Sequence, residues 1–152
     1  MTPEEKIAEL GLKLPEVVPP LAAYVPAVRT GDYVYTSGQV PMVEGKLAGT
    51  GKVGAEVTLE DAQRYARICA LNAIAALKTQ VGELSDVRRI VKVVVFVASA
   101  PEFTAQPSVG NGASELLRDV FGDLGVHARS AVGVAVLPLD APVEVELIAE
   151  VS

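Results

Sequence analysis

The sequence contains a single cysteine and a single histidine among its 152 residues. Cys69 therefore has no partner for an internal disulfide, and no His/Cys/Asp spacing indicates a metal site. Cys69 falls on the apolar side of a predicted helix, with no base beside it, which favours a buried structural thiol over a nucleophile. The glycines at positions 49, 51 and 54 do not form a Walker or Rossmann phosphate-binding motif. We expect neither a metal ion nor an organic cofactor.

Long hydrophobic runs and clusters of basic residues are also missing. Hydrophobic residues make up 50% of the chain, yet charges and glycines interrupt every apolar segment before it approaches the roughly 18 residues of a membrane span. No leader with a charged and an apolar part opens the chain, so we expect a cytoplasmic protein without membrane contact. The net charge is −6 and Arg88–Arg89 is the only basic cluster, which argues against a nucleic-acid partner.

The patterns that are present predict one α+β domain over residues 1–152. Thr2 with Glu5, and Thr58 with Asp61, match the capping box that opens a helix, and Gly82 stands where the second of these helices ends. The predicted order is a helix at 2–10, a proline-rich arm up to residue 30, a strand at 32–36, a hairpin and loop at 42–57, a helix at 58–81, a strand at 88–98, a helix at 108–121 and strands at 129–136 and 143–150.

The two long helices are expected to cover one face of a single mixed sheet. Apolar and small residues recur at helical spacing along 58–81, so one face of that helix can pack closely on the strands; they are Ala62, Tyr65, Cys69, Ala73 and Ala76. The opposite face of the sheet would then stay apolar and uncovered unless other copies of the chain cover it. We therefore expect a homo-oligomer.

The segment Gly110-Asn111-Gly112 lies in the first turns of the helix predicted at 108–121. Glycine and asparagine are poor helix formers, so helix propensity gives no reason for their presence there. A close approach of another backbone, or a polar contact at a functional site, would give one.

Arg129 is the strongest candidate for a binding residue. Side chains alternate faces along a strand, so Arg129 shares one side with the small residues Ala131, Gly133 and Ala135. A guanidinium beside small neighbours leaves room for a small carboxylate, which it can hold with two parallel hydrogen bonds. In the next strand, Glu144 and Glu146 take the face opposite Val143, Val145 and Leu147.

Over nearly its whole length the chain resembles the RidA (YjgF, reactive intermediate deaminase) family. The matching segments are Tyr24, TSGQVP at 36–41, VVVFVAS ending at Ser99, and Ala128-Arg129-Ser130 followed by LP and VEVELIA. The resemblance implies a fold like that of trimeric chorismate mutase, a homotrimeric barrel with clefts between neighbouring subunits. It also implies hydrolysis of reactive 2-imino or enamine acids to 2-keto acids and ammonia.

By position, the resemblance implies that Arg129 binds the substrate carboxylate and that Glu144 handles the attacking water. The remaining cleft positions are Tyr24 as a wall, Ser37 and Gly38, Asn111, and Ala131 through its backbone N–H. Ala131 replaces a frequent family cysteine, and Val136 stands where a second arginine often precedes the LP motif. These departures leave the arginine anchor in place.

Other interpretations stay open at these positions. Glu144 is also consistent with a solvated strand residue, Tyr24 with simple packing, and Asn111 with a helix-start cap. The alternative functions are a trimer that binds or senses a small carboxylate metabolite without turnover and, with less support, a ribonuclease.

A pairing of strands 129–136 and 143–150 as a hairpin would place Val136 opposite Val143 and Arg129 opposite Glu150. Glu144 would then lie roughly 20 Å along the ladder from Arg129. On this geometry the two residues meet at one substrate only between subunits.

Overall fold

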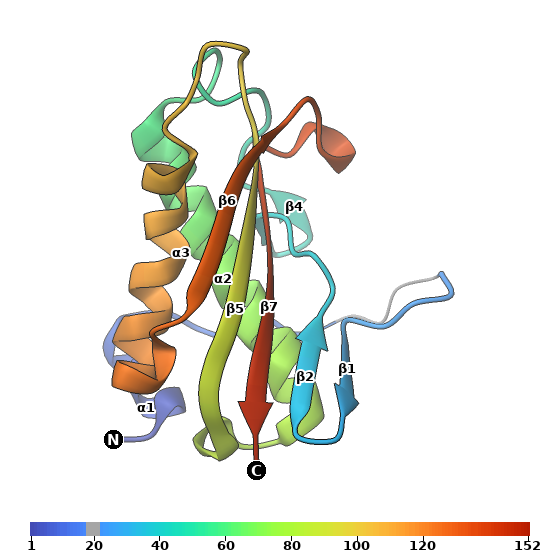
Figure 1. Cartoon of the computed structure of the whole chain (residues 1–152), viewed down its shortest axis with the longest axis vertical. Coiled ribbons are helices and arrows are strands. Elements are labelled where there is room, and N and C mark those ends of the chain that lie inside the picture. Colours follow the sequence, from blue (N-terminus) through green and yellow to red (C-terminus); the bar gives the residue numbers. More distant parts are fainter. Residues whose placement is uncertain (18–21) are drawn as a thin grey trace.

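A five-stranded sheet is the main element of the computed structural model, which describes residues 1–17 and 22–152 (Figure 1). Its strands are β1 (Ala27–Thr30), β2 (Tyr33–Thr36), β5 (Val87–Ala98), β6 (Ala128–Val134) and β7 (Val143–Val151). The described residues also form a small hairpin, β3 (Met42–Val43) and β4 (Lys46–Leu47), and the helices α1 (Pro3–Glu9), α2 (Leu59–Val81) and α3 (Gln106–Phe121). Short 3₁₀ turns are η1 (Leu84–Asp86), η2 (Gly122–Gly125) and η3 (Pro138–Asp140).

The strand order is β1-β2-β7-β5-β6, and β5 and β6 are the parallel pair of a mixed sheet. The predicted hairpin of 129–136 with 143–150 is therefore wrong. Because α3 links β5 to β6 as a crossover, these two strands become parallel neighbours. β7 then returns on the other side of β5 and pairs with it antiparallel. Glu150 lies opposite Tyr33 and Arg89 rather than Arg129.

The helices α2 and α3 cover the same face of the sheet, as predicted; Figure 1 shows α2 behind the strands and α3 beside it, to the left of β6. Alternate residues of β7 face these helices and are buried, among them Val143, Val145 and Leu147. The predicted apolar face of α2 is buried along its length, at Ala62, Tyr65, Cys69, Ala73 and Ala76. Small side chains let the helix approach the strands closely, so the predicted core is confirmed.

The ends of the helices follow their capping signals with one difference. Thr2 and Glu5 form the complete capping box at α1. At α2 the Thr58 side chain accepts a hydrogen bond from the Asp61 amide, but the Asp61 carboxylate pairs with Arg64 at 3.2 Å instead of returning to Thr58. The second capping box is therefore half-formed, since an arginine one turn away offers the carboxylate a charged partner.

The proline-rich arm ends earlier than predicted, because β1 lies within the residues assigned to it. Thr30 pairs with Tyr33, so Gly31 and Asp32 form a two-residue hairpin turn. Gly31 has a φ of +57°, which glycine adopts at little cost. Pro19 and Pro20 of the arm lie outside the described residues.

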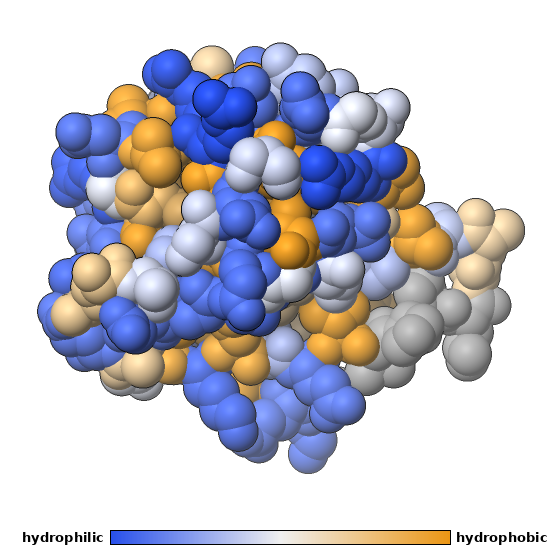
Figure 2. Space-filling model, turned by 90° about the horizontal axis from the view of Figure 1, so that it is seen from below, coloured by the Kyte–Doolittle hydropathy of each residue, from blue (hydrophilic) through white to orange (hydrophobic). Residues whose placement is uncertain are grey.

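The other face of the sheet carries no helix among the described residues. Large apolar side chains lie exposed on it from three strands: Val28 is 51% exposed, Tyr35 47% and Val132 44%. Phe96 and Ile148 continue this surface between them. By contrast, the end of the molecule seen in Figure 2 is mostly hydrophilic with scattered apolar residues.

No helix in the described part of the chain has both the length and the apolar character needed to cross a membrane.

Candidate functional site

Arg129 lies on the helix-covered face of β6, directly opposite the buried Val93 of β5. Its side chain therefore points toward α3. The Nη1 atom donates to Asn111 Oδ1 at 2.9 Å and to Ser114 Oγ at 3.1 Å. These contacts hold the guanidinium in a half-buried position against the helix instead of leaving it free in solvent.

The glycines of α3 allow this close approach. A Cβ atom at Gly110 would lie 3.2 Å from Arg129 Nη1 and 3.5 Å from the Cβ of Ala131. A Cβ at Gly112 would overlap the backbone carbonyl of Gln63 in α2. Both close backbone approach and a polar contact at the candidate site, the two reasons proposed for these helix-breaking residues, are thus present.

The small residues of β6 make room for protein atoms. Ala131 packs beside Gly110, and a Cβ at Gly133 would lie 2.8 Å from Gln106 Nε2 and 3.2 Å from Ser99 Oγ. Protein atoms thus fill part of the space beside this stripe, while Gly133 and Ala135 remain exposed, and the room for a carboxylate stays a prediction. A ligand of Arg129 would have to contact the part of the guanidinium that makes no hydrogen bond to α3.

Asn111 lies in the second turn of α3, because this helix begins at Gln106 rather than at Ser108. The interpretation of Asn111 as a helix-start cap is wrong. Its exposed side chain contacts the arginine through Oδ1, which leaves the amide nitrogen directed elsewhere.

His127 joins the same group of residues, which we call the arginine cluster: Gly110, Asn111, Ser114, His127, Arg129 and Ala131. The ring lies with Nε2 2.9 Å from Ser114 Oγ and Nδ1 2.6 Å from the carbonyl oxygen of Gly125. Partial burial lowers the pKa of His127, and the positive charge of Arg129 lowers it further, although the Gly125 contact opposes both.

Sequence reasoning missed Ser114 and His127 as members of the site. Both positions carried a signal: His127 precedes Arg129 by two residues along an extended segment, and Ser114 follows Asn111 by three residues on a helix. Side chains at these spacings share a face.

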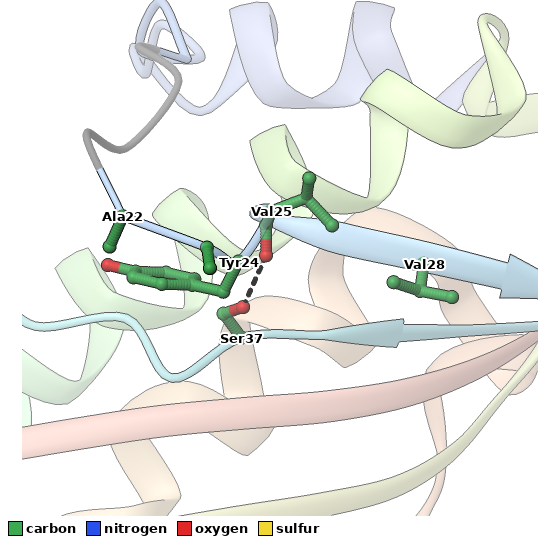
Figure 3. A pocket seen from close by; sticks show the side chains of 6 residues that line it. Ala22, Tyr24, Val25, Val28 and Ser37 are labelled. Atoms are coloured by element: carbon green, nitrogen blue, oxygen red, sulfur yellow. Dashed lines mark hydrogen bonds between the residues drawn. The ribbon is translucent and has the colours of Figure 1, made fainter.

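A second group of predicted residues gathers elsewhere, and we call it the glutamate cluster: Tyr24, Ser37, Gly38 and Glu144. A Cβ at Gly38 would overlap the Glu144 carboxylate, so the missing side chain gives that carboxylate its place. Ser37 Oγ donates to the Val25 carbonyl at 2.6 Å and ties the segment of Tyr24 to the end of β2. A shallow pocket forms here, and Figure 3 shows the Tyr24 ring extending past Ala22 and away from Val28.

Glu144 is half-buried on the face of β7 that no described helix covers. Burial raises its pKa, and the neighbouring carboxylate of Glu146 adds to the effect. A carboxyl group with a raised pKa can exchange a proton closer to neutral pH, which suits an acid or base in catalysis. Tyr24, by contrast, is 59% exposed, so packing within the chain does not account for it.

The structure does not bring the two clusters together within one chain. Arg129 is paired with Val93 and Glu144 with Phe96, three residues further along β5. Because faces alternate, the two side chains leave the sheet on opposite sides, with β5 between their strands. The expectation that one chain cannot place both on one substrate is confirmed, although through a different strand pairing from the predicted one.

Cys69 is fully buried on α2, and its thiol donates to the Val143 carbonyl at 3.5 Å. Burial raises its pKa well above the usual range, with Glu144 adding to the shift. The prediction of a structural thiol is confirmed.

The chain is similar in sequence and in fold to known proteins. Residues 4–151 match the family model described as YjgF/chorismate mutase-like endoribonuclease. Protein TCP17 of Trypanosoma cruzi is 44% identical over 96% of this chain and 92% of its own length. The 2-iminobutanoate/2-iminopropanoate deaminase of Escherichia coli is 34% identical over 85% of this chain and 88% of its own. The crystal structure of Atu1372 from Agrobacterium tumefaciens is 47% identical with a TM-score of 0.93, covering 99% of this chain and 94% of that one.

Proposed function

The chain belongs to the YjgF/chorismate mutase-like family, and on this premise we propose that it hydrolyses small 2-imino acids to 2-keto acids and ammonia. The relatives named as 2-iminobutanoate/2-iminopropanoate deaminases support this reaction. The substrate would bind in clefts between the subunits of a homotrimer.

The observation that carries the proposal is the fixed guanidinium of Arg129. Nη1 is held by Asn111 and Ser114, while Nε and Nη2 have no hydrogen-bond partner in residues 1–17 and 22–152. A guanidinium edge with two aligned donors matches the two oxygens of a carboxylate. A 2-imino acid and its 2-keto product both offer that group.

Two features support assembly around the site. The sheet face without a helix exposes apolar residues from several strands, as a surface buried between copies of a chain would. The arginine and glutamate clusters lie at different strands and on opposite faces, so a cleft that needs both takes one from each of two neighbouring subunits.

In the proposed mechanism, Arg129 binds the substrate carboxylate and backbone N–H groups near Gly38 and Ala131 assist. With the imine protonated, Glu144 accepts a proton from water as the water oxygen bonds to the C=N carbon and the π electrons move to nitrogen, which gives a neutral carbinolamine. Glu144 then returns the proton to nitrogen, and the hydroxyl group loses its proton to solvent as the C–N bond breaks, which releases ammonia and the 2-keto acid. Tyr24 closes the cleft. Proton transfer of this kind contributes roughly 10²–10⁴-fold, which suffices for a bond as labile as an imine.

The test uses freshly generated 2-aminoacrylate, which tautomerises to 2-iminopropanoate. We expect the purified protein to accelerate ammonia release over the buffer rate, and light scattering to give three times the mass of 15.9 kDa. A monomer, or a protein that neither speeds ammonia release nor binds pyruvate, would refute the proposal.

A second candidate is a trimer that binds a small carboxylate without turnover. It is favoured by Ala131 and Val136, which replace residues frequent in RidA-type clefts; Val136 is 68% exposed and brings no charge to the end of β6. Saturable pyruvate binding without faster ammonia release would select this function. The ribonuclease alternative finds no support in the net charge of −6. RNA cleavage that survives Arg129→Ala and further purification would revive it.

A further inference from the structure

We infer that Ser114 and His127 are positioning residues that fix Nη1 of Arg129 and so reserve its Nε–Nη2 edge for the ligand. This inference rests on the proposed function, because it takes Arg129 to be the group that holds a carboxylate. It adds two residues that the family resemblance did not place in the site, and it specifies which edge of the guanidinium the ligand meets.

Both hydrogens of Nη1 are already used. One is donated to Asn111 Oδ1 at 2.9 Å and the other to Ser114 Oγ at 3.1 Å. A guanidinium has five N–H donors, so the remaining three belong to Nη2 and Nε. A carboxylate that grips the arginine with two parallel bonds must therefore approach from the side, across Nε and Nη2, and not across the two terminal nitrogens.

The hydrogen-bond directions around His127 follow from its partners. The carbonyl of Gly125 can only accept, so Nδ1 carries a proton in every charge state of the ring. In the neutral ring Nε2 is then an acceptor, and the hydroxyl of Ser114 donates to it. The same hydroxyl oxygen accepts from Arg129. The bonds thus run in one direction, from Arg129 through Ser114 and His127 to Gly125, and each strengthens its neighbours.

This series of hydrogen bonds is held against α3 at two residues, Ser114 and Gly125. Ser114 belongs to the helix itself, and a Cβ at Gly125 would overlap the backbone carbonyl of Leu117, so η2 lies directly against α3. The same helix also lies close to the guanidinium at Gly110, where an added Cβ would be 3.2 Å from Nη1. The guanidinium is therefore fixed by a rigid element and not by solvent.

The groups around the ring favour its neutral form. Arg129 on β6 is the charged group that acts on His127, whereas α3 offers a hydroxyl and η2 a carbonyl. A second positive charge beside the guanidinium would be repelled, which agrees with the lowered pKa of His127. The neutral ring preserves the acceptor that orients Ser114.

The test compares pyruvate binding to the full-length protein by calorimetry across matched variants. Ser114→Ala and His127→Phe break the chain of bonds and are expected to weaken binding about tenfold. His127→Gln keeps an acceptor in reach of Ser114 and is expected to restore most of the affinity. Ser108→Ala, the same substitution two turns earlier in α3, is expected to bind as the wild type does. Circular dichroism and light scattering check that each variant folds and assembles.

An NMR measurement tests directly which edge of the Arg129 guanidinium meets the ligand. With arginine labelled by ¹⁵N and Arg129→Ala used for assignment, saturation with pyruvate is expected to shift the Nε–H resonance of Arg129. An unmoved resonance at saturation would overturn the side-on assignment. Wild-type affinity in both Ser114→Ala and His127→Phe would overturn the positioning role.

The two levels of failure are distinguishable. If Arg129→Ala binds pyruvate as tightly as the wild type, the proposed function is wrong. If Arg129→Ala abolishes binding while the Ser114 and His127 variants leave it unchanged, the proposed function stands and only the positioning role is wrong.

Discussion

The arginine cluster and the glutamate cluster are built in different ways. Arg129 is held by the hydrogen bonds that it donates to Asn111 and Ser114 of α3, on the covered face of the sheet. Glu144 occupies the space that a side chain at Gly38 would fill, and it lies on the sheet face that carries no helix among the described residues. The first cluster is complete within one chain and suits binding. Under the proposed function, the second would gain its remaining surroundings from a neighbouring subunit, so that folding fixes recognition and assembly completes the catalytic site.

The largest effect separates binding from turnover. Arg129→Ala removes two charge-assisted hydrogen bonds, so pyruvate affinity should fall by about 100-fold. Glu144→Gln should leave pyruvate affinity within about twofold while turnover falls by roughly 10²–10⁴-fold. Calorimetry and ammonia release measure the two quantities. Equal losses of affinity in both variants would contradict the division of roles.

Subunit mixing tests where the two clusters meet. If each cleft takes Arg129 from one subunit and Glu144 from the next, every mixed trimer of Arg129→Ala and Glu144→Gln chains has one intact cleft. Refolding an equal mixture should then recover about a quarter of the wild-type ammonia release, although each variant alone is nearly inactive. A mixture as inactive as its parents would place both residues in a cleft of one chain.

Two glycines of α3 should respond in opposite ways. Gly112→Ala places a methyl group into the Gln63 carbonyl and should lower the free energy of unfolding by about 3 kcal/mol through overpacking between α2 and α3. Gly110→Ala meets the end of the long Arg129 side chain, which can shift by a few tenths of an ångström without moving any backbone, so its gain in helix propensity of about 1 kcal/mol should largely survive. Pyruvate affinity should nevertheless fall several-fold, since the guanidinium is displaced. Denaturant unfolding and calorimetry distinguish the two, and similar stability losses would contradict the contact assignment.

The smallest effect concerns pH. Because the pKa of Glu144 is raised in the folded state, ionisation of this group lowers the free energy of unfolding. The effect is absent below pH 4.5 and grows as the pH rises above that value. Because the pKa of His127 is lowered in the folded state, protonation of this ring also lowers the free energy of unfolding. The effect is absent above pH 6.5 and grows as the pH falls below that value. Thermal unfolding across pH should show that Glu144→Gln flattens the first change and His127→Gln the second. Unaltered profiles would show that neither group is perturbed by folding.

Much of the fold could be predicted because its signals are local. Capping residues and spacing gave α1 and α2 to within about two residues, and the run of β-branched residues gave β5. The pairing of β6 with β5 was not accessible in this way, because a short connection between β6 and β7 resembles a hairpin and the parallel crossover depends on how α3 packs. β1 was missed because nearby prolines obscured its alternation.

The site was predictable where one residue type carries the chemistry. Arg129 and Glu144 were found by charge and position, and Gly110 and Gly112 by their conflict with helix propensity. Ser114 and His127 were not, because a serine in a helix and a histidine before a strand have many ordinary roles. Their function depends on distances between α3, η2 and β6 that no single segment encodes.

Cys69 is a built-in probe of how often the core becomes exposed to solvent. The thiol is fully buried against β7, so a reagent that modifies thiols reaches it only when α2 lifts from the sheet. Its labelling rate therefore reports how often the interior becomes accessible, without any introduced probe. A ligand that stabilises the folded protein should slow that rate.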